Sequence, residues 1–157
     1  QVKNPVSNAK VNGNYVHSIV ALTEALEAGF DEALMLDADG YIAEGSGENF
    51  FIVKDGVLSS PNLDSCLDGI TRRTIIELAE ELNIPFQVNQ LTVQDVLDAD
   101  ESFFSGTAAE VVPINSLDGQ SIGTGLRGPI TEKLQQTYFD QVRGERDLNS
   151  PWLTFTN

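Results

Sequence analysis

A tight turn at Lys54-Asp55-Gly56 joins two apolar runs and constrains the fold of this chain more than any other feature. Phe50–Val53 precedes the turn, and Val57-Leu58 follows it. Aspartate followed by glycine suits the positive backbone φ angles of a hairpin turn, so the two runs should pair as neighbouring antiparallel strands. The sheet that contains this hairpin should therefore be mixed or largely antiparallel.

Apolar periodicity and turn residues predict the other elements. Helices are expected over residues 15–28, 70–82, 93–99 and 130–142. Further strands are expected over 33–36, 85–88, 102–104 and 111–114, and from Tyr41 onward. The strand at 33–36 is expected to be buried. No internal repeat or interdomain linker is visible, so we expect one α/β (α+β) domain with a mixed sheet and flanking helices.

Composition excludes several classes of partner. The chain has 157 residues, of which 41% are hydrophobic, which suits one globular domain with its own core. A formal net charge of −15 repels nucleic acid and anionic lipid, and no apolar run approaches the roughly 20 residues that span a bilayer. The first residues lack a signal-peptide layout and an initiator Met, so we expect a cytoplasmic chain that begins partway through a longer protein.

Several short patterns are better explained by structure than by chemistry. Cys66 and His17 each occur alone, which excludes an internal disulfide and makes a zinc site or a Ser-His-Asp triad a poor explanation. Gly123–Gly128 matches a dinucleotide-binding pattern, but only one helix and a polar tail follow it, so a glycine-rich turn before a helix is expected. Asp37–Gly40 resembles the start of a calcium loop, but its glycine comes two positions early, which favours a hairpin turn.

Two segments combine ionisable side chains with small residues. Lys10 lies among small polar residues just before a predicted helix, where spacing alone favours a solvated loop lysine. Glu44 lies in a strand-forming run that two glycines interrupt, and strand alternation puts it on the same face as Ile42. An inward-pointing Glu44 would need a cationic or hydrogen-bonding partner, whereas a surface bulge would leave it exposed.

Two further turns offer free backbone N–H groups beside a threonine. Leu67–Arg72 opens a predicted helix, and Ser105–Ala109 follows a predicted strand. Such groups can hold a phosphate without a basic field, although ordinary helix capping explains a single turn equally well.

These segments, in this order and spacing, closely resemble the branched-chain aminotransferases, which depend on pyridoxal 5'-phosphate (PLP) and share the D-amino acid aminotransferase-like PLP fold type IV. The resemblance runs from Asn8 to about Trp152. The matching stretches are SNAKVNGNY, EGSGENFF, LDGITRR, SGTAAEVVPI and GPITEKLQ.

The resemblance implies a role for each matched residue. Lys10 would form the Schiff base with PLP, and Glu44 would pair with the pyridine nitrogen. Tyr15 would lie near the cofactor's O3′ and the substrate, and Leu67 would pack on the ring. The phosphate would be held by Gly69, Ile70, Thr71, Gly106 and Thr107, and the substrate carboxylate by Thr107 and Ala108.

The implied activity is transamination of leucine, isoleucine or valine with 2-oxoglutarate, with amino acid and 2-oxo acid substrates and no metal. Other members of the same fold remain alternatives: D-amino acid aminotransferases, R-selective amine transaminases and aminodeoxychorismate lyases. A non-catalytic small-molecule-binding domain is a further alternative.

In this family a smaller N-terminal domain precedes the lysine and supplies a phosphate-binding arginine and part of the substrate pocket. Lys10 lies near the start here, so residues 1–157 are expected to be the large, C-terminal, PLP-binding domain of a longer enzyme, truncated at its N-terminus. The full enzyme would be a homo-oligomer, either a dimer or a larger assembly.

Overall fold

The computed structural model describes residues 10–146 and 152–154. Its helices are η1 (Asn12–Tyr15), α1 (Val16–Glu27), α2 (Ile70–Glu81), α3 (Val93–Leu97) and α4 (Pro129–Val142). Its strands are β1 (Leu34–Leu36), β2 (Ile42–Gly45), β3 (Asn49–Lys54), β4 (Val57–Pro61), β5 (Phe86–Asn89), β6 (Glu101–Gly106), β7 (Glu110–Pro113), β8 (Ser116–Leu117) and β9 (Gln120–Ser121). None of the described helices is long and apolar enough to cross a membrane.

The central sheet has the order β5-β4-β3-β6-β7. The predicted hairpin joins β3 to β4, and Asp55 and Gly56 at its turn both have positive φ angles. β3–β6 and β6–β7 are also antiparallel, whereas β4 and β5 are parallel. The prediction of a mixed, largely antiparallel sheet is therefore confirmed.

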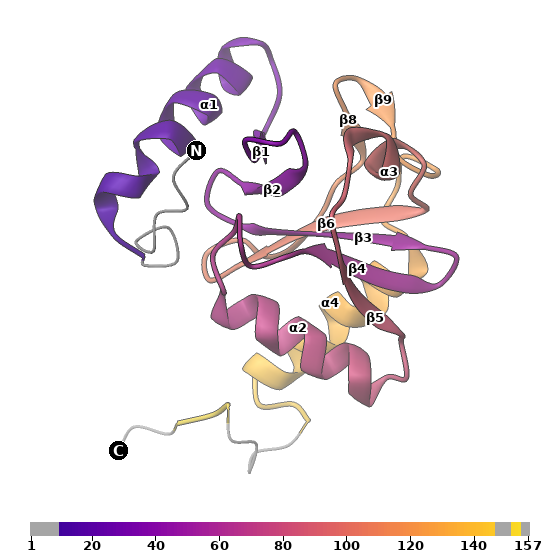
Figure 1. Ribbon diagram of the computed structural model, residues 1–157. Coiled ribbons are helices and arrows are strands. Elements are labelled where there is room, and N and C mark those ends of the chain that lie inside the picture. The colour runs from indigo at the N-terminus through magenta and orange to yellow at the C-terminus, as the bar shows by residue number, and fades with distance from the viewer. Residues whose placement is uncertain (1–9, 147–151, 155–157) are drawn as a thin grey trace.

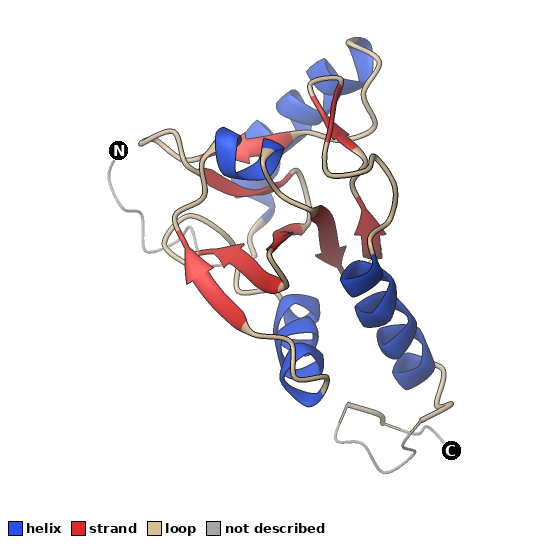
Figure 2. Ribbon diagram, turned by 90° about the vertical axis from the view of Figure 1, so that its right-hand side faces the viewer, coloured by secondary structure: helices blue, strands red, loops and turns tan. Residues whose placement is uncertain are grey.

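Strand alternation divides the core between the two faces of this sheet. On one face, Phe51 and Phe103 stack with ring centroids 4.8 Å apart, and α2 and α4 lie side by side over them (Figures 1 and 2). On the other face, Phe50 and Phe104 meet edge to face and pack with side chains such as Val96 of α3. Residues at successive positions of β3 and β6 thus serve opposite layers.

Helix α1 stands apart from the central sheet (Figure 1). It has no buried residue, and its apolar side chains Val16, Ile19, Val20 and Leu26 are all exposed. The periodicity that predicted this helix therefore reflects an apolar face that no described residue covers.

Two sequence expectations need correction. The strand at 33–36 was expected to be buried, but β1 is half-buried to exposed because it pairs only with β2, in a separate small sheet. The hairpin of β8 and β9 was not predicted, because its strands have two residues each. Its turn, Asp118-Gly119, has positive φ angles at both residues and was the signal available in the sequence.

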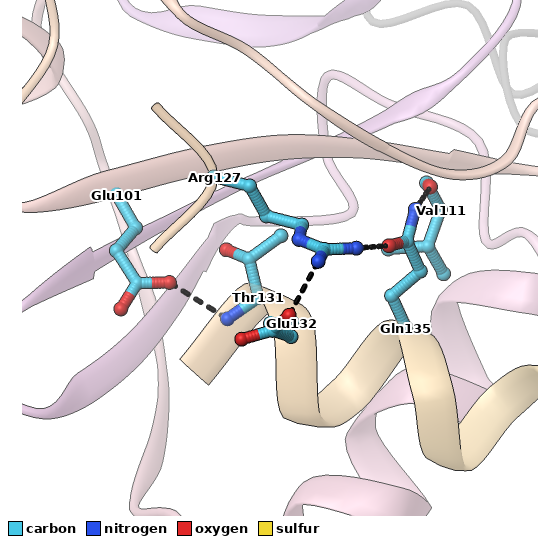
Figure 3. Close-up of polar contacts among 6 residues, drawn as sticks. All are labelled: Glu101, Val111, Arg127, Thr131, Glu132 and Gln135. Atoms are coloured by element: carbon cyan, nitrogen blue, oxygen red, sulfur yellow. Dashed lines mark hydrogen bonds and ion pairs between the residues drawn. The ribbon is translucent and has the colours of Figure 1, made fainter. Parts of the chain in front are cut away.

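The glycine-rich segment at 123–128 is the turn that leads into α4, as expected. Glu101, buried at the start of β6, accepts hydrogen bonds from the backbone N–H groups of Ile130 (3.0 Å) and Thr131 (2.6 Å), as Figure 3 shows for Thr131. Arg127 also contacts α4, through an ion pair with Glu132. A carboxylate at a helix N-terminus satisfies free amides and complements the helix dipole.

We expect Gly128→Ala to destabilise the fold because the new methyl group would collide with the Glu101 carboxylate. A Cβ built on Gly128 lies 2.1 Å from Cδ of Glu101. Overpacking and lost buried hydrogen bonds should together lower the free energy of unfolding by about 2 kcal/mol or more. Urea unfolding should show this loss, whereas the control Gly47→Ala, whose Cβ meets no atom within 4 Å, should change stability by less than about 0.5 kcal/mol. Equal stability of the two variants would contradict the prediction.

Candidate functional site

The acidic residues of the site are Glu44, near the end of β2, and Glu48, in the short loop between β2 and β3. The backbone N–H of Gly45 donates to the carbonyl of Glu48 (2.7 Å), which closes the loop. A Cβ on Gly45 would lie 2.8 Å from the ring of Phe104, so this position needs glycine for close packing. The interruption of the strand pattern by glycine is thus explained by a tight loop over the sheet.

Glu44 and Asn49 hold the backbone of Leu67 from both sides. Oε2 of Glu44 accepts from the N–H of Leu67 (3.0 Å), and Nδ2 of Asn49 donates to its carbonyl (2.7 Å). A Cβ on Gly69 would lie 2.2 Å from Oδ1 of Asn49, so glycine is required here as well. The stretches EGSGENFF and LDGITRR are therefore joined by hydrogen bonds. Asn49 is a site residue to which the sequence analysis gave no role, although it lies in the first of these stretches.

Glu44 lies partly buried, and burial raises its pKa above the ordinary value. The hydrogen bond from the Leu67 amide opposes this rise, the charge of Glu48 adds to it, and the charge of Lys10 lowers the pKa. Lys10 is exposed but lies close enough to Glu44 for its charge to act there. The acid and the lysine that the sequence singled out thus share one electrostatic environment.

Tyr15 is half-buried at the junction of η1 and α1, downstream of Lys10. The preceding part of the predicted segment, residues 7–9, lies outside the described residues. The role of Tyr15 beside a cofactor stays a prediction.

Glu48 belongs to the same loop and lies next to a second acid. Burial raises the pKa of Glu48 above its ordinary value, the N–H of Gly47 opposes this, and the charge of Glu32 and a hydrogen bond with it add to the rise. Glu32 also accepts from the N–H groups of Ala33 (2.7 Å) and Ser46 (3.4 Å). Local sequence patterns do not reveal this carboxyl pair, because Glu32, which precedes β1, approaches the loop only in the folded chain.

The turn between β6 and β7 packs on the same loop. A Cβ on Gly106 would lie 3.4 Å from Cγ of Glu48 and 3.7 Å from the carbonyl of Gly47. Thr107 and Ala108, which follow Gly106, are exposed. The loop at 45–49 therefore contacts both turns that the sequence singled out, one through Gly69 and the other through Gly106.

No side chain within residues 10–146 and 152–154 caps the first backbone N–H groups of α2. Gly69 is its N-cap and provides no side-chain hydrogen bond, and Ile70 at the first position is exposed. The hydroxyl of Thr71 is buried and hydrogen-bonded to that of Tyr138 on α4, so the free group of Thr71 is its backbone N–H. Uncapped amides at the start of a helix favour an anion.

A separate groove of about 780 Å³ lies between α1, β1 and the segment that contains β8 and β9. Apolar side chains such as Phe30, Leu34 and Ile122 contribute to its lining. Lys10, Glu44, Leu67, Thr71 and Thr107 do not line this groove. Of the predicted site residues, Glu44 contacts Leu67, and Gly69 and Gly106 pack against the loop at 45–49.

Known proteins match this chain closely. The branched-chain-amino-acid aminotransferase of Pseudomonas aeruginosa is 53% identical over 149 residues, which are 95% of this chain and 48% of that protein. The enzyme of the same name from Escherichia coli K12 is 46% identical over 150 residues, again 95% of this chain and 48% of that protein. The chain thus spans about half the length of these curated relatives.

Solved structures agree in fold. The T.th. branched-chain amino acid aminotransferase complexed with N-(5'-phosphopyridoxyl)-L-glutamate has a TM-score of 0.94 and 45% identity, covering 99% of this chain and 54% of that one. The enzyme from Thermoproteus uzoniensis with norvaline has a TM-score of 0.90 and 49% identity, covering 96% of this chain and 50% of that one. The expected PLP fold type IV architecture is confirmed.

A family model described as amino-transferase class IV matches residues 1–117, which include every predicted site residue. This match extends over more than half of the chain. The chain therefore belongs to the amino-transferase class IV family.

Proposed function

We propose that this chain is the PLP-binding portion of a branched-chain aminotransferase, which transfers the amino group of leucine, isoleucine or valine to 2-oxoglutarate. The observation that carries the proposal is the partly buried Glu44 carboxylate, fixed by the Leu67 amide and influenced by the charge of Lys10. The names of the relatives support the substrate class, and the phosphopyridoxyl-glutamate complex supports glutamate and 2-oxoglutarate as the second pair.

The residues present fit PLP. Glu44 is a carboxylate for the pyridine nitrogen, and Lys10 is an amine for the aldehyde. The uncapped amides of Ile70 and Thr71 at the start of α2 provide donors for the phosphate. Gly106 lets the backbone approach closely, and Thr107 adds a hydroxyl. A chain with a net charge of −15 must bind phosphate through local donors of this kind.

PLP, when bound, supplies a conjugated pyridinium ring that accepts the electron pair released at the substrate Cα. Glu44 holds the proton on the ring nitrogen. The amine of Lys10 moves the proton between the substrate Cα and C4′ of the cofactor as a general base and then a general acid. Tyr15 orients the cofactor near O3′, Leu67 packs on the ring, and the amides of Thr107 and Ala108 hold the substrate carboxylate.

The half-length match to the relatives also bears on the place of this chain within a longer protein. We propose that residues 1–157 are the large C-terminal domain of an enzyme whose smaller N-terminal domain supplies a phosphate-binding arginine and one wall of the substrate pocket. The half-length match to the relatives supports this arrangement. We further propose that the enzyme is cytoplasmic. We also propose that it is a homo-oligomer, because assembly would shield the exposed apolar face of α1.

The test is transamination of valine with 2-oxoglutarate. The chain, purified with excess PLP, should react far more slowly than the full-length P. aeruginosa relative assayed beside it. Without the arginine, the phosphate loses hydrogen bonds worth roughly 1.5–3 kcal/mol each, and without the wall, the substrate loses orientation. The rate should be compared per mole of bound cofactor.

Comparable rates per cofactor would show that the chain is complete in itself, contrary to this proposal. Joining the chain to the first half of the relative should raise the rate. A joined protein that transaminates D-alanine but none of the three branched-chain L-amino acids would instead support the D-amino acid aminotransferase alternative.

A further inference from the structure

Arg72 is a buried cation in the first turn of α2. Its residue is 4% exposed, although guanidinium groups are seldom buried without an ionic partner. Nε donates to Oγ of Ser60 (3.2 Å), and Nη2 donates to the carbonyl of Pro61 (3.4 Å). Both acceptors are neutral, and among residues 10–146 and 152–154 no carboxylate lies within ion-pair distance of Arg72.

These contacts join α2 to the sheet. Ser60 and Pro61 end β4, and the hydroxyl of Ser60 donates in turn to the carbonyl of Phe50 on β3 (3.0 Å). The guanidinium therefore links the first turn of α2 to two neighbouring strands. Burying a charge costs free energy, and burial indeed lowers the pKa of Arg72. A methionine of similar length would fill the space without that cost.

The two residues that carry the phosphate-binding amides lie between two fixed points. On one side, Glu44 and Asn49 hold both backbone polar groups of Leu67. On the other side, Arg72 attaches the helix to β4. The segment in between contains the N-cap Gly69 and the uncapped residues Ile70 and Thr71. The direction of their amides is thus set from both ends.

We propose that Arg72 is a positioning residue for the cofactor phosphate: its buried side chain fixes the first turn of α2 so that the amides of Ile70 and Thr71 converge on one phosphate. This inference rests on the proposed function, because it assigns PLP to the site. Arg72 acts through the backbone and does not touch the cofactor.

The neighbouring Arg73 provides a matched control. It lies in the same helical turn and carries the same charge, but it is exposed and pairs with Asp68 at the surface. Replacing either arginine by methionine removes one positive charge from the start of α2. Only Arg72→Met also removes the contacts to β4.

The experiment compares PLP with pyridoxal, which lacks the phosphate. Dissociation constants of the whole chain for the two compounds are measured by absorbance titration, for the wild type, Arg72→Met, Arg72→Lys and Arg73→Met. Losing one hydrogen bond to a charged group costs about tenfold or more in affinity. Arg72→Met should therefore reduce the preference for PLP over pyridoxal at least tenfold, and Arg73→Met should change it less than about threefold. Arg72→Lys keeps the charge but lacks the forked donors, so its preference should also fall.

Each outcome separates the two proposals. A wild-type chain without a preference for PLP would overturn the proposed cofactor and this inference with it. A wild-type preference that both Arg72 variants retain would overturn the role of Arg72 alone. Equal weakening of PLP and pyridoxal would assign Arg72 to the fold rather than to the phosphate site and would also overturn the inference. If Arg72→Met fails to fold, the result for Arg72→Lys decides.

Discussion

Replacing Lys10 by alanine should abolish covalent attachment of PLP and slow transamination by about a thousandfold or more. The amine is expected both to bond to the cofactor and to move the proton at the substrate Cα, and a positioned general acid–base group alone contributes roughly 10²–10⁴-fold in rate. Alanine removes both functions. Because Lys10 is exposed, the substitution should leave the free energy of unfolding within about 0.5 kcal/mol of the wild type.

The measurement is borohydride reduction of the chain with PLP, followed by peptide mapping. Label should appear on Lys10 and be absent from Lys10→Ala. Lys54 and Lys133 are internal controls: Lys54 is exposed and lies 3.2 Å from Asp100, in an ion pair beside the hairpin turn. Label on either of these lysines with none on Lys10 would overturn the assignment and the family alignment of this segment.

Local sequence signals account for most of the fold. Asp55-Gly56 specified the hairpin of β3 and β4, and apolar spacing located α2 and α4 within a residue at each end. These features depend on residues close together in the chain, such as turn residues and the faces of a helix. Two-residue strands such as β8 carry too little periodicity to be recognised in this way.

Features that depend on tertiary contact were not accessible from local patterns. The exposure of β1 follows from its lack of a place in the central sheet. The attachment of Leu67 by Glu44 and Asn49 joins residues 23 and 18 positions apart. Family resemblance identified Glu44 as important, whereas only the folded chain reveals that its carboxylate also orders the segment before α2. The convergence of Thr71 and Thr107 on one phosphate stays a prediction.

In the complete enzyme, Glu44→Gln should slow transamination by about a hundredfold or more while leaving PLP bound. A neutral amide holds the proton on the pyridine nitrogen poorly, so the ring accepts less charge in the transition state, and losing an electrostatic contact of this kind commonly costs about 10²–10³ in rate. The glutamine oxygen can still accept from the N–H of Leu67, so the segment before α2 should remain in place. The turnover number and the dissociation constant for PLP are measured together.

The stability of the PLP-free chain distinguishes a role of Glu44 in catalysis from a role of Glu44 in stabilising the fold. Burial raises the pKa of Glu44 in the folded state above its ordinary value of 4.5, so the folded chain binds this proton more tightly than the unfolded chain does. The contribution of Glu44 to stability should therefore fall as the pH rises from the ordinary pKa through the raised one. At neutral pH, ionising Glu44 costs more free energy in the folded chain than in the unfolded chain, so Glu44→Gln should be at least as stable as the wild type. The difference should vanish near pH 3, where the carboxyl group is protonated in both states.

Glu48→Gln is the matched control, because Glu48 lies in the loop that follows Glu44 and its pKa is also raised, chiefly by burial. It removes a neighbouring carboxylate without removing the proposed partner of the ring nitrogen. A large loss of turnover in Glu44→Gln with a much smaller one in Glu48→Gln would support a direct contact between Glu44 and the ring. Equal losses of turnover in the two variants would attribute the slower reaction to the combined charge of Glu44 and Glu48. An unchanged turnover number in Glu44→Gln would exclude the proposed role of Glu44 at the ring nitrogen. Because the amide substitution is expected to preserve or increase stability at neutral pH, slower catalysis could not be attributed to unfolding.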